Sequence, residues 1–141
     1  MGVSINSIQQ QVWKLASKIN APKSLTTVFA TSPQDGRPHV EIHKDEFRLV
    51  TMERGALFSE KVTEDLDILL YWIFRSITSR MAQDYELQHR VEHQDSRRIM
   101  FSKQLELMSK LSSSWHNRMR DEIDAILVAN PYVDPPPPTY I

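Results

Sequence analysis

The 141-residue chain contains no cysteine and only three glycines. Without cysteine it has no disulfide framework, no thiolate chemistry and no cysteine-based metal site. Its glycines are scattered, which excludes a phosphate-binding loop and a dinucleotide-binding fingerprint, because both need closely spaced glycines. No serine lies in the G-x-S-x-G pattern of serine hydrolases. The sequence therefore offers no catalytic set of these classes.

The chain also has no excess of charge of one sign. It carries 17 basic and 18 acidic side chains, a formal net charge of −1 at pH 7, and no block of like charge stands out. Proteins that hold nucleic acids by neutralising phosphates need a basic patch, so we expect no nucleic-acid partner. Residues 1–15 show neither the basic nor the apolar segment of a signal peptide, so we expect a cytoplasmic protein.

Long apolar runs are absent as well. The longest, residues 68–74, has seven apolar or aromatic residues, far fewer than the roughly 20 that cross a bilayer, so we expect no membrane association. Thr63 as a cap, followed by acids in a first turn, predicts that a helix begins just before this run. Seven residues make about two helical turns, so this helix is apolar all round there. We expect a central helix with Trp72 and Phe74 in the core.

The remaining periodicity predicts an α+β fold. Residues 4–20 have apolar positions three and four apart, typical of a helix that Pro22 ends. Residues 24–62 alternate like strands between turn residues and predict a short antiparallel β-meander of three or four strands. The expected extended runs are residues 25–30, 39–43, 47–52 and 57–62, with a loop marked by Pro33, Asp35-Gly36 and Pro38 and a turn at Arg54-Gly55. Residues 94–130 predict another long helix, kinked or split by the serines at 112–114. The expected order is an N-terminal helix, the meander, then two long C-terminal helices.

The chain is expected to form one α+β domain over residues 1–130, followed by a proline-rich tail over residues 131–141. This tail holds most of the eight prolines and cannot form a helix or a central strand. Its Pro137-Pro138-Thr139-Tyr140 sequence fits the P-P-x-Y ligand of WW modules. A polyproline segment is already extended, so it binds the aromatic grooves of such modules at a low entropic cost. The alternative is a stiff tail that lies against its own domain.

The one metal-like pattern is H-x-x-E-H, formed by His89, Glu92 and His93. On a helix the two histidines would lie on one face and share a zinc ion, with the glutamate as base. Zinc enzymes of this kind also need a third ligand from a sizeable further domain, and little chain follows. Two solvated histidines are the simpler interpretation. A small metal-dependent hydrolase stays open as an alternative.

Two adjacent arginines, Arg97 and Arg98, follow this pattern. An arginine pair can grip a phosphate or a carboxylate of a ligand. The commoner arrangement at a helix start is pairing with nearby acids, here Glu92 and Asp95. No ligand is required to explain the pair.

A wider pattern of residues runs through the chain from Glu53 to Trp115. It comprises Glu53-Arg54-Gly55, residues 63–74, Met81-Ala82, Tyr85-Glu86-Leu87, Arg97-Arg98, Phe101, Gln104-Leu105-Glu106, Leu111-Ser112 and Trp115. This pattern resembles the immunity protein 63 family of bacterial immunity proteins, which are encoded beside polymorphic toxins, including those of contact-dependent growth inhibition. The resemblance covers about residues 39–131.

The resemblance implies a small cytoplasmic protein that binds the C-terminal domain of one cognate toxin, one to one, and neutralises it. It implies no enzymatic activity and no cofactor. Toxin domains that act on nucleic acids are often basic, so we expect carboxylates on the blocking surface. The densest acidic cluster is Glu60, Glu64, Asp65 and Asp67, although acids in a first helical turn also suit the helix dipole. A helical adaptor that docks through the proline-rich tail is the other alternative.

Overall fold

A computed structural model describes residues 2–137 of the chain. The chain folds into two compact units, Met1–Phe74 and Arg75–Ile141. The single domain over residues 1–130 stays a prediction. Of the P-P-x-Y motif only Pro137 belongs to the described part, and the other three residues lie outside it.

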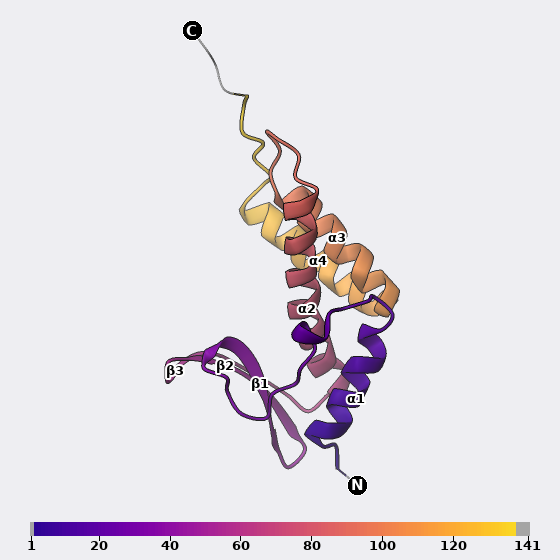
Figure 1. Cartoon of the computed structure of the whole chain (residues 1–141), viewed down its shortest axis with the longest axis vertical. Coiled ribbons are helices and arrows are strands. Elements are labelled where there is room, and N and C mark those ends of the chain that lie inside the picture. Colours follow the sequence, from indigo (N-terminus) through magenta and orange to yellow (C-terminus); the bar gives the residue numbers. More distant parts are fainter. Residues whose placement is uncertain (1, 138–141) are drawn as a thin grey trace. The chain divides into compact units, whose positions relative to one another are not determined.

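The expected α+β order is confirmed (Figure 1). The elements are α1 (Ile5–Ala16), the short 3-10 helix η1 (Lys23–Leu25), β1 (Asp35–His43), β2 (Glu46–Glu53), β3 (Ala56–Thr63), α2 (Leu66–Gln88), α3 (Arg97–Leu111) and α4 (Ser113–Ala129). The second long helical stretch is split at Ser112. This residue has an extended backbone, and its hydroxyl accepts a hydrogen bond from the Trp115 amide at 3.2 Å, so it caps α4.

The three strands form one antiparallel sheet in the order β1-β2-β3. The expected turn at Arg54-Gly55 is present, and both residues have positive φ, as tight hairpins require. Two expectations were wrong in detail. Gly36 and Pro38 belong to β1 and not to a loop, because an edge strand tolerates proline. Residues 25–30 make only an isolated bridge to β1, through Phe29.

The core of the first unit lies between α1, the sheet and the first turns of α2. Its buried side chains include Ile8, Val12, Val40, Phe47, Leu49, Leu69, Tyr71 and Phe74. Phe74 is thus confirmed as a core residue. Trp72 is not: it is only partly buried, and the Nζ atom of Lys61 lies 5.8 Å from its ring centroid. The helix is not wrapped on all sides here, because Trp72 and Ile68, four residues apart, share a side that stays partly open.

The second unit consists of the remainder of α2 with α3 and α4. Its buried apolar residues include Ile77, Ala82, Leu107, Met108, Trp115, Met119 and Ile123. The buried Gln104 amide is satisfied, because its Nε2 donates to the Thr78 hydroxyl at 3.2 Å and to the Arg75 carbonyl at 3.1 Å. Within residues 2–137, none of the helices combines the length and the apolar character of a bilayer-crossing segment.

Candidate partner-binding surface

The start of α2 is organised by Asp65. Its carboxylate accepts a hydrogen bond from the Asp67 amide at 2.8 Å, and its carbonyl accepts one from the Leu69 amide at 3.2 Å. These are the bonds of an N-cap residue. The expectation that Thr63 caps the helix was therefore wrong. Its hydroxyl accepts from the Asp65 amide at 3.0 Å instead and so fixes the approach to the cap.

The four acids of the predicted cluster have different surroundings. Glu64, Asp65 and Asp67 lie together at the junction of β3 and α2, all three exposed. Glu60 lies further back on β3 and forms an ion pair with Arg48, 3.3 Å away on the neighbouring strand. Capping and the helix dipole account for Asp65 and Asp67. Neither explanation applies to Glu64, which lies between β3 and α2 with its side chain exposed.

Next to these acids, β3 exposes large apolar side chains. Leu57 is 59% exposed, Phe58 is 65% exposed and Val62 is 47% exposed. The pairing with β2 shifts between Thr51 and Met52, which places a β-bulge at Phe58 and interrupts the two-residue alternation. The sequence predicts this strand, but not its exposure, because a bulge leaves no clear sequence signal.

Strand β1 carries a second polar group, in which one carboxylate joins two histidines. The Glu41 carboxylate lies 2.8 Å from the Nε2 atom of His39 and 2.8 Å from that of His43. These hydrogen bonds, first from His43 and then from His39, lower the pKa of Glu41. His39 is buried, and its Nδ1 atom has no hydrogen-bond partner within residues 2–137.

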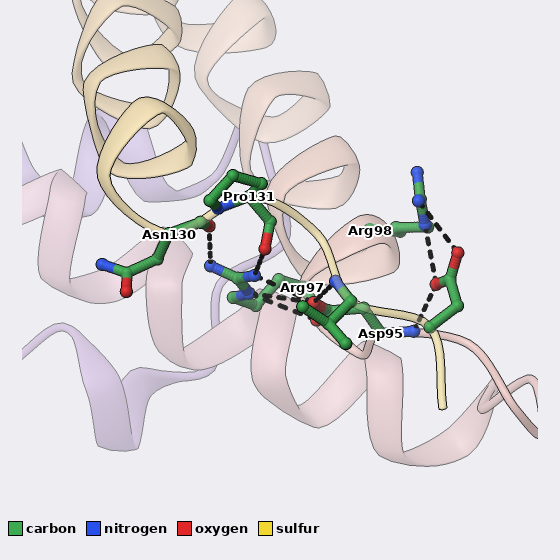
Figure 2. Close-up of polar contacts among 7 residues, drawn as sticks. Asp95, Arg97, Arg98, Asn130 and Pro131 are labelled. Atoms are coloured by element: carbon green, nitrogen blue, oxygen red, sulfur yellow. Dashed lines mark hydrogen bonds and ion pairs between the residues drawn. The ribbon is translucent and has the colours of Figure 1, made fainter. Parts of the chain in front are cut away.

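The arginine pair is engaged within the protein. Figure 2 shows the Asp95 carboxylate beside the Arg97 guanidinium, with Nη2 at 2.9 Å. The same guanidinium donates to the carbonyls of Asn130 and Pro131, each at 2.9 Å. Asp95 also accepts the Val133 amide at 3.0 Å. The start of α3 is thereby tied to the chain that leaves α4.

Arg98 completes this connection. It donates to both carboxylate oxygens of Asp134, at 3.0 and 2.9 Å, and Asp134 also accepts the Asp95 amide at 2.8 Å. The Tyr132 ring lies against both arginines, 4.3 Å from the Arg98 guanidinium and 5.5 Å from that of Arg97. Asp95 is thus a partner of the pair, as expected. The second acid is Asp134 and not Glu92, and no ligand is needed to balance the arginines.

These contacts shift the acidities of the two aspartates. Hydrogen bonds from Arg97, and then from the Val133 amide, hold the pKa of Asp95 well below its usual range. Hydrogen bonds from Arg98, and then from the Asp95 amide, lower the pKa of Asp134. In both residues, hydrogen bonding to the charged form is the main cause.

The H-x-x-E-H pattern does not lie on a helix, because α2 ends at Gln88. The His89 ring stacks on Tyr85 at 4.0 Å between centroids, and its Nδ1 donates to the Tyr85 carbonyl at 2.9 Å. His93 has a left-handed backbone, with φ of 60°. Within residues 2–137, no three or more His, Asp or Glu side chains are arranged to hold a metal ion. The metal-dependent alternative therefore gains no support.

The chain is similar in sequence to a known protein family. Residues 44–125 match the family described as Immunity protein 63. The chain belongs to this family. The resemblance proposed from the sequence is confirmed. No curated protein and no solved structure matches the chain.

The immunity protein 63 match contains β2, β3, α2, α3 and most of α4. It includes all four acids of the cluster and the exposed strand β3. It excludes α1 and residues 126–141, and so excludes the carboxylate of Asp134 that holds Arg98. For an immunity protein, the exposed β3–α2 junction is therefore a candidate surface inside the family region.

Proposed function

We propose that this immunity protein binds the C-terminal domain of one cognate toxin in the bacterial cytoplasm and neutralises it by one-to-one binding, without catalysis. The observation that carries the proposal is the family match over residues 44–125. The toxin belongs to a polymorphic-toxin system, of which contact-dependent growth inhibition is one kind. Neutralisation by binding needs a stable complementary surface on the immunity protein, and it needs no cofactor.

The acids at the β3–α2 junction are the proposed contact surface. Glu60, Glu64, Asp65 and Asp67 are close in sequence at one strand end and one helix start. Lys61, the basic residue among them, has its Nζ 5.8 Å from the ring centroid of Trp72, and so lies toward α2. A basic toxin surface would find several carboxylates here, which favours rapid and correctly oriented encounter.

The direct test is complex formation with the toxin domain encoded beside this gene. The chain and that domain, inactivated by a mutation in its own active site, are mixed and separated by size-exclusion chromatography. We expect one complex with one copy of each protein. An immunity protein from an unrelated toxin pair is the control and should remain separate. Two proteins that elute independently at all concentrations would end the proposal.

A further inference from the structure

The last strand of the sheet has an open edge. In the order β1-β2-β3, strand β3 pairs with β2 on one side, and the described residues provide no strand on the other. The opposite edge differs, because the Val40 amide of β1 donates to the Phe29 carbonyl at 2.8 Å. An open edge offers a row of backbone donors and acceptors to another strand.

The exposed apolar side chains of β3 would be more stable when buried against a partner than in water. Leu57, Phe58 and Val62 make three large exposed apolar residues on an eight-residue strand. Isolated exposed apolar residues are common on protein surfaces, but several on one open edge mark an association site. Burying them against a second strand would remove apolar area from water while the backbone groups form hydrogen bonds.

Two features that usually protect an edge are weak here. A lysine on an edge strand discourages pairing, but Lys61 is directed toward Trp72. A β-bulge also discourages pairing, but the bulge lies at Phe58, near the start of the strand. From Ser59 to Thr63 the pairing with β2 is regular, so this part of the strand keeps an ordinary outer edge.

The charges at the two ends of the strand identify the partner. Arg54 lies in the turn before β3 and Glu64 directly follows it, and neither forms an ion pair with another described residue. When two copies of the strand run antiparallel around a twofold axis, the start of one lies beside the end of the other. Arg54 of each copy then faces Glu64 of the other, and the twofold axis passes beside Ser59. A parallel arrangement would oppose like charges instead.

We propose that two copies of this chain associate through antiparallel pairing of their β3 strands, with an Arg54–Glu64 contact at each end of the shared ladder. The pairing joins two three-stranded sheets into one continuous sheet and leaves no open β3 edge. This association does not rest on the proposed toxin binding, although both use Glu64. Dimerisation is therefore measured without toxin, and toxin binding is measured with the chain monomeric, so either can fail without the other.

The first measurement is the mass of the full chain by light scattering or sedimentation over a wide range of concentration at low salt. The monomer has a mass of 16.4 kDa, and we expect a shift to twice this mass as concentration rises. A chain that stays monomeric at all concentrations contradicts the proposal. This holds even if the β3 edge binds a different protein.

Charge exchange then tests the surface. Arg54→Glu alone or Glu64→Arg alone places like charges at both ends of the ladder, and each should raise the dimer dissociation constant by about tenfold. An equimolar mixture of these two variants should dimerise again, because each mixed pair has opposite charges at both ends. Arg120→Glu, on α4, is the matched control and should dimerise like the original chain. If the single variants dimerise normally, or if mixing restores nothing, another surface is responsible and the proposal is wrong.

The absence of cysteine allows an independent check. Ser59→Cys introduces one thiol near the middle of β3, close to the proposed twofold axis, where cross-strand residues approach within disulfide range. Mild oxidation should give a cross-linked dimer quickly. Ser102→Cys, exposed on α3, is the control and should cross-link slowly. Equal rates for the two variants would contradict pairing through β3.

Discussion

Arg97 and Asp95 are two residues apart, yet their contact organises two segments of the second unit. The Arg97 Nη2 atom lies 2.9 Å from the Asp95 carboxylate, while Nη1 donates to the Asn130 carbonyl at the end of α4. A helix end leaves backbone carbonyls without partners, and an arginine satisfies them well. This relationship holds the start of α3 against residues 130–134.

Removing that arginine should release the segment after α4. In Arg97→Ala we expect the Val133 amide, which donates to Asp95, to exchange with solvent considerably faster than in the original chain. Amide exchange followed by NMR provides the measurement. Arg120→Ala is the control and should leave Val133 unchanged. Equal protection in Arg97→Ala would show that the guanidinium does not hold this segment.

Acid should release the same segment. The folded-state pKa values of Asp95 and Asp134 lie below the ordinary aspartate value of 3.8, so their ionised forms stabilise the folded state above that pH. This contribution is lost as the pH falls below about 3.8 and through the folded-state values. We expect the protection factor of the Val133 amide to fall in this range. In Asp95→Asn it should already be low at neutral pH and should change little on acidification.

Core packing in the first unit gives a stability prediction. Phe74 is fully buried, so Phe74→Ala removes a ring and leaves a cavity, and we expect a loss of about 3–5 kcal/mol. Phe58→Ala removes the same ring from an exposed position and should cost at most about 0.5 kcal/mol. Urea unfolding at a dilution that keeps the chain monomeric compares the two. Similar losses in both variants would contradict the assignment of the core.

The helices and the tight turn could be predicted from the sequence, for physical reasons. Apolar residues three and four apart identify helix faces, and Pro22 stops the first helix. Gly55 is compatible with positive φ, so Arg54-Gly55 identified a hairpin turn. The sequence did not distinguish a kink from a split at residues 112–114, because serine both caps helices and occurs within them.

The features that the sequence did not predict depend on contacts between residues far apart in the chain. Trp72 and Phe74 belong to the same apolar run, and only tertiary packing determines that Trp72 is partly buried while Phe74 is fully buried. The Arg97–Asp95 pair is local and was expected, whereas the Arg98–Asp134 pair joins residues far apart. The acidic cluster at the β3–α2 junction was predicted because its residues are close in sequence, and its role stays a prediction. The exposure of β3 depends on a bulge and on sheet order.

Charge reversal tests the proposed toxin surface. Glu64→Lys together with Asp67→Lys should slow toxin association, more at low salt than at high salt, because steering by exposed charges is screened. Stopped-flow or surface-based kinetics, with the chain monomeric, measure the rate. Asp84→Lys with Asp121→Lys makes the same charge change elsewhere and is the control. An association rate unaffected by the first pair at low ionic strength would remove this surface from consideration.

Growth protection tests the central claim most directly. The toxin domain encoded beside this gene is expressed in bacteria with this chain, with an immunity protein from an unrelated pair, or with the His89→Ala and His93→Ala double variant. We expect growth to be restored by this chain and by the histidine variant, and not by the unrelated protein. Growth that stays inhibited although the folded chain is abundant in the cells would contradict neutralisation of this toxin.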